Sequence, residues 1–200
     1  PAAGMLMASV QGRALDLADV LSFDLGGTTA KGALVRNFAP LKTEQMEVAR
    51  VHEFRRGSGL PLRIPVLDMI EIGAGGGSIA AVDDRGLLKV GPRSAGANPG
   101  PACYGRGGQN AALSDANLVL GYLDPDFFLG GEMPLDRDAA TGTIQSTVAE
   151  PLGLSVERAA WGIHDTASED IARAFRIHAA ERGFDYRAAS MVAFGGSGPL

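Results

Sequence analysis

The residues best suited to chemistry lie in the sequence SFDLGGTTAKGALV, which begins at Ser22. A short apolar segment ends in Asp24, and the residues LGGTT separate it from a second apolar segment that begins at Ala30. Paired glycines let a backbone turn tightly and bring its N–H groups up to an anion. A neighbouring carboxylate and hydroxyl groups suit a metal ion and phosphate oxygens. The pattern therefore predicts a nucleotide-phosphate turn between two strands, although glycine turns also connect ordinary hairpins.

Two further glycine segments stand at the ends of apolar segments. One reads GAGGGS from Gly73 to Ser78, and the other reads GGSGPL at the end of the chain. Three consecutive glycines are entropically costly, so a ligand or a backbone must approach closely there. A bound ligand and a tight structural crossing both remain open as the reason for the GAGGGS segment.

Composition excludes several classes of protein. The 200 residues are 46% apolar, which is enough for one domain or one lobe of a larger protein. A net charge of −5 gives no electrostatic footprint for nucleic acid. The sequence has no apolar stretch long enough for a membrane span, so none is expected. A secretory leader is not expected either, because PAAGMLMASVQGR lacks a basic start followed by an apolar block. Cys103 is the only cysteine, which excludes an intramolecular disulfide and favours a reducing, cytoplasmic setting.

The elements that must position these residues alternate between strands and helices. The apolar patterns predict a helix over 2–10 and strands over 20–24, 30–35, 45–51, 66–72, 79–82, 87–90 and 191–194. The strand over 45–51 is expected to extend the first hairpin as a third antiparallel strand, and the strand over 66–72 is expected to be buried. The sequence DDRG at 83–86 predicts a hairpin turn.

The second half of the chain is expected to be mostly helical. The spacing of apolar residues predicts helices over 114–123, 136–152 and 155–182, with Ser155 as the N-cap of the last and Gly183 at its end. The segment 91–108 is so rich in Gly and Pro that it predicts a long loop without regular structure. Such a loop in a compact domain is usually functional or disordered.

Other polar residues carry weaker signals. Arg93, Ser94 and the segment 99–105 are candidates for lining a substrate pocket. Cys103 has no base placed near it by the sequence, so a buried structural role is favoured over a nucleophile. Ser114 or Asp115 is expected to cap a helix, with a polar site pair of Asp115 and Asn117 as the alternative.

The remaining candidates point to structure more than to chemistry. Asp68 and Glu71 would face opposite sides of a strand, so they are not expected to act as a pair. The three histidines, His52, His164 and His178, lack the spacing of a zinc site. Three aromatic residues are expected in the core: Trp161, Phe127 and Phe128.

The order of the glycine motifs resembles the ATPase superfamily that includes actin, sugar kinases and heat-shock chaperones. PAAG, followed at an interval by FDLGGTT, is similar to the small-residue helix that leads into the second phosphate hairpin of chaperones. VAFGGSG is similar to the adenosine motif of the same superfamily. The resemblance implies an α/β fold, an actin-like (ribonuclease H-like) ATPase lobe with a mixed sheet flanked by helices and a glycine-rich β-hairpin and loop insertion.

The match narrows over the whole chain. FDLGGTTAK, IGAGGGSIAAVD, VGPRSAGANPGPACYGRGG, SDANLVLGYLDPDFFLGGEMPLD and VAFGGSGPL, in this order, resemble the A-type component of the hydantoinase/5-oxoprolinase family. This family includes ATP-dependent hydrolases of hydantoins, 5-oxoproline and lactams, and subunits of acetone and acetophenone carboxylases. The resemblance implies that ATP phosphorylates the oxygen of an amide or ketone, and that a partner component then hydrolyses or carboxylates the activated substrate.

The resemblance also implies ligands, partners and roles for particular residues. ATP and Mg²⁺ (or Mn²⁺) are the expected cofactors, and a B-type hydantoinase component is the expected partner of an oligomeric full-length protein. The expected substrate is a small cyclic amide or ketone. Asp24 is the candidate catalytic and metal-binding residue. The candidate nucleotide-binding residues are Gly26, Gly27, Thr28, Thr29, Gly75, Gly76, Gly77, Ser78, Gly195, Gly196 and Ser197.

The chain is expected to be one domain, cut at both ends, of a longer protein. Residues 1–56 and 136–200 would form the core of the second ATPase lobe, and 57–135 a glycine-rich inserted region. The N-terminal lobe, with the other phosphate motif, would lie outside these residues, so the segment alone is expected to be inactive.

The function is left with alternatives. A cyclic-amide hydrolase is the leading hypothesis, and a ketone carboxylase shares its motifs. A small-molecule kinase and a non-catalytic ATP-sensing lobe are the other two. The sequence departs from the family pattern at one point of the hairpin. Many relatives have an aspartate shortly after the threonines, whereas here Thr29 is followed by Ala30 and Lys31, which implies a different branch of the family or a different metal arrangement. Lys31 itself is either a phosphate ligand or a solvated side chain.

Overall fold

The structure of the chain is a computed structural model that describes residues 2–49, 51 and 57–197. The chain forms two compact units. We call residues 1–23, 31–70 and 178–192 the sheet unit, and residues 24–30, 71–177 and 193–200 the glycine unit. The bounds of these two units differ from those of the expected lobe core (1–56 and 136–200) and inserted region (57–135), so the expected domain assignment stays a prediction. His52 and the last three residues of the predicted closing loop lie outside the described residues.

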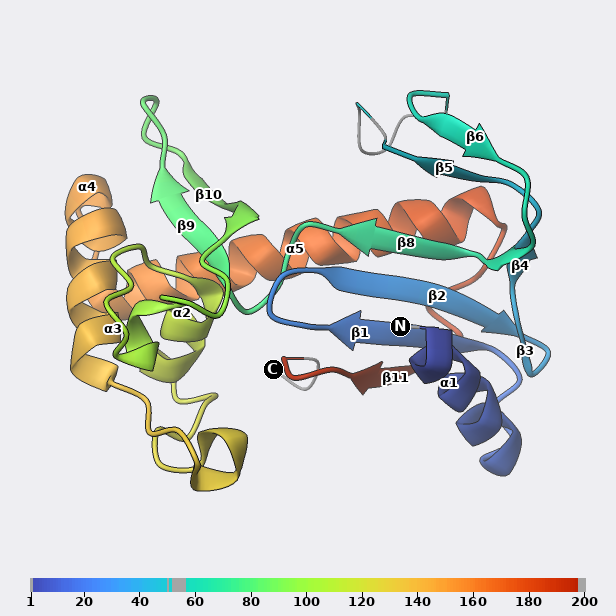
Figure 1. Cartoon of the computed structure of the whole chain (residues 1–200), viewed down its shortest axis with the longest axis horizontal. Helices are drawn as coiled ribbons and strands as arrows, with labels where there is room; N and C mark the ends of the chain where they lie inside the picture. Colours follow the sequence, from blue (N-terminus) through green and yellow to red (C-terminus); the bar gives the residue numbers. More distant parts are fainter. Residues whose placement is uncertain (1, 50, 52–56, 198–200) are drawn as a thin grey trace. The chain divides into compact units, whose positions relative to one another are not determined.

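The sheet unit is built on a five-stranded sheet with the order β11-β1-β2-β3, in which β8 also pairs with β2. Its strands are β1 (Val20–Leu25), β2 (Ala30–Arg36), β3 (Ala39–Pro40), β8 (Met69–Ile72) and β11 (Ser190–Phe194). Figure 1 shows β1 and β2 running in opposite directions, and β3 is antiparallel to β2. The predicted hairpin around the GGTT turn is therefore confirmed.

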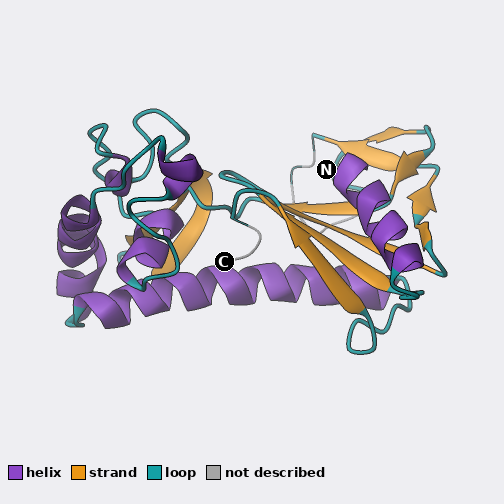
Figure 2. Ribbon diagram, turned by 90° about the horizontal axis from the view of Figure 1, so that it is seen from below, coloured by secondary structure: helices purple, strands orange, loops and turns teal. Residues whose placement is uncertain are grey.

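Both faces of this sheet carry apolar side chains, because neighbouring residues of a strand point to opposite sides. Other elements cover each face. Helix α1 (Ala2–Ala14) lies against one face, where Ala8 packs with Val20 and Val35 (Figure 2). On the other face, Leu34 packs with Ala179 and Phe184. The apolar alternation of β2 thus fixes a core on each side of the sheet.

Short strand pairs complete the sheet unit and correct two expectations. β5 (Met46–Val48) pairs antiparallel with β6 (Leu60–Leu62), so it does not extend the first hairpin as a third strand. β4 (Lys42–Thr43) pairs with β7 (Val66–Leu67), and β8 is a separate strand. The expected buried strand over 66–72 is thus two short strands, which are largely half-buried or exposed. Sequence patterns do not specify these distant partners.

The glycine unit contains the antiparallel hairpin of β9 (Ser78–Val82) and β10 (Leu88–Ser94). Its helical elements are η1 (Ala102–Tyr104), α2 (Leu113–Val119), η2 (Phe128–Gly131), α3 (Arg137–Ile144), η3 (Gln145–Ala149), α4 (Glu150–Leu152) and α5 (Val156–Glu181), of which the residues up to Ile177 belong to this unit. The predicted hairpin and the long last helix are confirmed. The segment 91–108 is more regular than expected, since it holds the end of β10 and η1.

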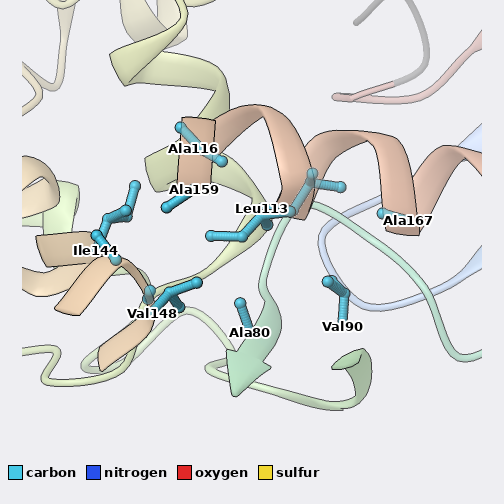
Figure 3. Close-up of a cluster of buried hydrophobic side chains, with 12 residues drawn as sticks. Ala80, Val90, Leu113, Ala116, Ile144, Val148, Ala159 and Ala167 are labelled. Atoms are coloured by element: carbon cyan, nitrogen blue, oxygen red, sulfur yellow. The ribbon is translucent and has the colours of Figure 1, made fainter. Parts of the chain in front are cut away.

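Small side chains let the elements of the glycine unit pack closely. Ala80, Ala159 and Ala167 are buried with Ile144 and Val148 in one core cluster (Figure 3). The expected helix over 136–152 is divided by the π-helical turn η3 into α3 and α4. The expected helix over 114–123 ends earlier, at Val119.

Two expected core aromatics are on the surface. Trp161 is 51% exposed and Phe127 is 68% exposed, so their placement in the core was wrong. Phe128 is half-buried and contacts Tyr104. Within the described part of the chain, no helix is long and apolar enough to cross a membrane.

Candidate functional site

The glycine unit brings the three glycine segments of the sequence together. The Gly76 N–H donates to the Gly26 carbonyl at 3.0 Å, and the Gly77 N–H donates to the Gly27 carbonyl at 2.6 Å. From the closing segment, the Ser197 N–H donates to the Leu25 carbonyl at 2.9 Å. Backbone hydrogen bonds therefore hold segments that are about 50 to 170 residues apart in the sequence.

Glycine at positions 75 and 77 is required by this contact. A Cβ on Gly75 would lie 2.7 Å from the Gly26 carbonyl oxygen and 2.7 Å from the Thr28 nitrogen. A Cβ on Gly77 would lie 2.9 Å from the Gly27 oxygen. From the sequence, the glycines of GAGGGS could be explained either by a tight backbone crossing or by a bound ligand. This geometry supports the backbone crossing. Gly75, Gly76, Gly77 and Ser78 are buried, and their assignment as nucleotide contacts stays a prediction.

Asp24 lies beside the closing segment. A Cβ on Gly195 would lie 2.6 Å from the Asp24 Oδ1 atom and would also overlap the Leu25 carbonyl. Gly195 has a φ of +92°, which glycine adopts without strain. The half-buried Asp24 carboxylate thus faces a backbone that must carry no side chain there.

The tip of the hairpin is open. The turn is closed by a hydrogen bond from the Gly26 N–H to the Thr29 carbonyl at 3.1 Å. Gly27 and Thr28 are exposed, and their backbone N–H groups have no hydrogen-bond partner among the described residues. A glycine turn with free, adjacent N–H groups is a suitable anion-binding concavity.

Serine hydroxyl groups surround the buried part of the contact. The Ser114 Oγ donates to the Gly76 carbonyl at 2.8 Å, and the Ser78 Oγ accepts the Gly75 N–H at 2.8 Å. The Ser197 Oγ lies 2.7 Å from the position of a Cβ on Gly76. Ser114 was expected only as a helix cap, because its distance in sequence from the glycine segments hid this contact.

The polar groups around the hairpin suit an ion such as Mg²⁺, which takes some of its ligands from phosphate and water, better than a metal ion that is bound by protein side chains alone. Among the described residues, no three His, Cys, Asp or Glu side chains gather in a group that could hold a metal. Mg²⁺ is usually bound by one or two carboxylates together with substrate phosphates and water. Asp24 beside an anion-binding turn fits that requirement.

Asp115 and Cys103 lie in the core of the glycine unit. Asp115 lies in the first turn of α2 and caps the helix by accepting the N–H of Ala112, which is itself the N-cap residue in place of the expected Ser114 or Asp115. The Asp115 carboxylate also accepts the N–H groups of Ala102 and Cys103. Burial raises the pKa of the Cys103 thiol, and the nearby Asp115 charge adds to this. Burial also raises the pKa of Asp115, against the opposing effect of its N–H donors. The thiol therefore stays protonated at neutral pH, which favours its structural role.

The other candidates lie apart from this contact or show no role in it. Asp68 forms an ion pair with Arg182 in the sheet unit, where Lys31 is half-buried at the start of β2. Arg93 is exposed, and the Ser94 Oγ accepts the Gly96 N–H at 3.1 Å. Asn117 is buried, with its Oδ1 atom 2.9 Å from the His164 Nδ1 atom. The expected pair of Asp115 and Asn117 thus has two separate sets of partners.

Relatives of known activity are similar to the chain over nearly its whole length. The chain is 42% identical over 98% of its length to the caprolactamase subunit alpha of Pseudomonas jessenii, and covers 26% of that protein. It is 37% identical over its full length to the acetophenone carboxylase gamma subunit of Aromatoleum aromaticum, and again covers 26% of it. The chain thus spans about a quarter of the length of these relatives.

Solved structures of such enzymes share the fold. A nucleotide-free structure of acetone carboxylase, from work on ATP-dependent acetone carboxylation, matches with a TM-score of 0.84 and 32% identity. The match covers 98% of this chain and 26% of that one. The chain therefore has an α/β fold of mixed sheet and helices. The sequence profile of the hydantoinase/oxoprolinase family matches residues 1–200, and the chain belongs to this family.

Proposed function

We propose that this chain is the ATP-binding lobe of an ATP-dependent cyclic-amide hydrolase. The observation that carries the proposal is the junction of the three glycine segments, with the open hairpin tip and Asp24 at its edge. Family membership supports the reaction class, since a caprolactamase and oxoprolinases are relatives. Hydantoins, 5-oxoproline and lactams are the substrate class.

Each segment has a distinct role in this proposal. The free N–H groups of Gly27 and Thr28 would bind the phosphates, with the Thr29 hydroxyl nearby. Asp24 would hold Mg²⁺, through water, against the phosphate oxygens; Mn²⁺ has the same ligand preference. The ion supplies neutralisation of phosphate charge when bound. The closing segment with Gly195, Gly196 and Ser197 would face the adenosine.

The chemistry needs positioning more than a protein nucleophile. A lactam resists water because its amide is unactivated. Its oxygen attacks the γ-phosphorus of ATP, the bond to the bridging oxygen breaks and ADP leaves, so that the amide carries a phosphate. At a partner component, water would then add to the activated carbon and the ring C–N bond would break, with the proton going to the nitrogen. A second water would release phosphate from the resulting acyl phosphate. The buried thiol of Cys103 has no part in these steps, and the exposed hairpin tip contributes by orienting phosphate.

The rest of the assignment follows from the same superfamily resemblance. We propose an actin-like lobe with 1–56 and 136–200 as its core and 57–135 as an insertion. Its partner would be a B-type component in a cytoplasmic oligomer, and relatives named as subunits of larger enzymes support a partner. The full-length protein would supply the other phosphate motif.

A ketone carboxylase is the second candidate function. Acetophenone carboxylase and acetone carboxylase subunits are relatives at 37% and 33% identity over the full chain. In that reaction the phosphorylated oxygen would be that of an enolised ketone, and bicarbonate would supply the carbon. The same glycine segments would serve both reactions.

The decisive experiment measures ATP hydrolysis by the full-length protein with its partner component. Hydantoins, 5-oxoproline, lactams and ketones are tested with and without bicarbonate. Stimulation by a cyclic amide without bicarbonate supports the proposal, and stimulation that requires ketone and bicarbonate selects the carboxylase. A stable phosphorylated product without the partner would indicate a kinase. ATP binding without turnover on any substrate would indicate a sensing lobe.

A variant of Asp24 tests the assigned site. Asp24→Asn should lower kcat roughly 100-fold or more, because positioning and charge neutralisation carry most of phosphoryl transfer. Asp84→Asn is the matched control, since Asp84 is an exposed carboxylate of the β9–β10 turn in the same unit. Equal activity of the two variants would remove Asp24 from the site.

A further inference from the structure

Asp115 is a fully buried carboxylate with an unusual set of partners. Its Oδ1 atom accepts the Cys103 N–H at 2.7 Å. Its Oδ2 atom accepts the N–H groups of Ala112 at 2.8 Å and of Ala102 at 3.2 Å. A helix cap requires only the bond to Ala112, so the other two bonds have a different consequence. They fix η1, and with it the segment 91–108, to the start of α2.

The start of α2 is in turn bound to the glycine junction. Ser114, the residue before Asp115, donates its N–H and its Oγ to the Gly76 carbonyl at 2.7 and 2.8 Å. The Gly76 N–H donates to the Gly26 carbonyl of the hairpin at 3.0 Å. A path of hydrogen bonds therefore connects η1 to the phosphate hairpin, and its only covalent step is from Asp115 to its neighbour Ser114. The whole path lies within the glycine unit.

A second bond path runs from the same segment to the junction. The Ala95 N–H, just after β10, donates to the Gly77 carbonyl at 2.8 Å, and the Gly77 N–H donates to the Gly27 carbonyl. Between these two attachments the segment 96–99 is exposed, and Arg106 donates to the Ala97 carbonyl at 3.2 Å. The segment is thus an exposed loop whose two ends are both attached to the hairpin.

We infer that Asp115 is a positioning residue that couples the loop 91–108 to the phosphate hairpin, and that this loop is the side on which the phosphoryl-accepting cyclic amide lies. The inference rests on the proposed function. A loop fastened at both ends to the hairpin can hold an acceptor oxygen at a fixed distance from the bound phosphate. Asp115 acts through Cys103, Ser114 and Gly76, and it does not contact the reactants.

A carboxylate is needed for this role because its oxygens accept hydrogen bonds on both sides. An asparagine of the same shape has one oxygen and one NH₂ group. Whichever way the amide points, its NH₂ group faces at least one backbone N–H, either that of Cys103 or those of Ala102 and Ala112. The buried segment around η1 must then shift, while the direct bonds between Gly76, Gly77 and the hairpin remain.

The test uses Asp115→Asn in the full-length protein with its partner component, and measures both products and ATP consumed. We expect the ratio of ring-opened product to ATP hydrolysed to fall about tenfold, since a small misplacement of the acceptor slows transfer more than it weakens nucleotide binding. The KM for ATP should change less than about threefold, because the hairpin tip is untouched. Asp84→Asn is the matched control: it makes the same substitution at an exposed carboxylate of the β9–β10 turn in the same unit, and its product-to-ATP ratio should equal that of the wild type.

Ser114→Ala provides a second variant if Asp115→Asn does not fold. It removes the Oγ bond to the Gly76 carbonyl but keeps the backbone N–H bond of residue 114 to the same carbonyl, and the ratio should fall in the same direction by a smaller factor. Wild-type ratios in both variants would overturn the inference, as would a raised KM for ATP with an unchanged ratio. Absence of ATP turnover by the wild type on every substrate would contradict the proposed function itself, which is a different outcome.

Discussion

The glycine junction of the glycine unit and a charged cluster in the sheet unit join distant parts of the chain by opposite means. In the junction, main-chain groups bond to main-chain groups, and glycines leave no side chain between them. In the cluster, Arg182 forms a two-point ion pair with Asp68, which is 114 residues away. One contact depends on the absence of side chains, and the other depends on their charge.

The charged cluster includes a buried imidazole. Arg182 also donates to the His178 carbonyl at 3.0 Å and to Glu181 at 3.1 Å. The His178 Nε2 atom is buried and has no hydrogen-bond partner among the described residues. Burial lowers the pKa of His178 to about 4, and the Arg182 charge acts in the same direction against Asp68 and Glu181. His178 is therefore neutral at pH 7.

This difference separates two kinds of sensitivity. Backbone hydrogen bonds carry no ionisable group, so the junction should withstand changes in pH and salt but should not tolerate even a methyl group. The stability of the charged cluster should be less sensitive to a change in side-chain size. It should instead depend on the charges of its side chains and therefore on pH. The proposed nucleotide site would gain from a scaffold of the first kind, because the bound phosphates are highly charged.

The largest effect should come from Gly75→Ala. Its Cβ would lie 2.7 Å from two backbone atoms of the hairpin, so one of the two segments must move. We expect a loss of about 3 kcal/mol in local stability and near-complete loss of ATP turnover. Hydrogen exchange of peptides covering 24–30 and 73–78 measures the first. Gly142→Ala, in α3 where an added Cβ meets nothing within 4 Å, should preserve both. Normal protection in Gly75→Ala would show that the junction can relax.

A loss of stability of similar size, but confined to the sheet unit, should follow removal of the charged pair by Arg182→Met. The side chains of Arg182 and Asp68 are only 18% and 16% exposed, so the remaining carboxylate would be left largely buried. We expect hydrogen exchange of the β2 peptide to show a loss of about 3 kcal/mol, with the junction peptides unchanged. Arg173→Met is the control, because its pair with Asp170 is exposed and should contribute less than about 0.5 kcal/mol. A similar result for both variants would contradict the contrast between the regions.

The same contrast explains how much of the molecule the sequence predicted. The hairpin at Asp24, the β9–β10 turn and helix α5 depend on neighbouring residues, and local patterns identified them. The pairing of β5 with β6 and the split of the strand over 66–72 depend on distant partners, which no local pattern specifies. The exposure of Trp161 was missed for a related reason, since its aromatic side chain alone favoured the core and residue type does not show which other element covers it.

In the candidate site, sequence motifs identified the segments but not their connections. Three consecutive glycines signalled a close approach at GAGGGS, and the structure identifies the neighbour of Gly75 and Gly77 as the hairpin backbone. Ser114 and Asp115 were predicted as caps from their place before a helix. Their bonds to Gly76 and Cys103 cross long stretches of sequence, and only the folded chain shows them.

A fall in pH should weaken the sheet unit through His178. Its folded pKa of about 4 lies below the ordinary value of 6.5, so the unfolded state binds the proton more readily. Its contribution is complete above about pH 6.5 and is lost as the pH falls toward 4. Between pH 7 and pH 5 we expect a loss of about 2 kcal/mol, measured by hydrogen exchange of the β2 peptide.

The control for this prediction is His178→Gln, which removes the titrating group. The difference in local stability between the wild type and this variant should shrink as the pH falls from 7 to 5. A difference that stays constant would mean that His178 does not titrate in this range in either state. Peptides of the glycine junction should show no matching change.

The smallest effect should come from a side-chain bond inside the glycine unit. The Asp136 carboxylate accepts the Ala139 N–H at 2.8 Å and caps α3. Asp136→Ala should lower the local stability of α3 by about 1 kcal/mol, the usual contribution of an N-cap, as measured by hydrogen exchange of its peptide. Protection of the junction peptides should stay at the wild-type level, because the bonds that join the glycine segments to the hairpin run between main-chain groups. If the junction lost protection as well, its resistance would depend on the stability of the whole unit, and the absence of side chains would not explain it.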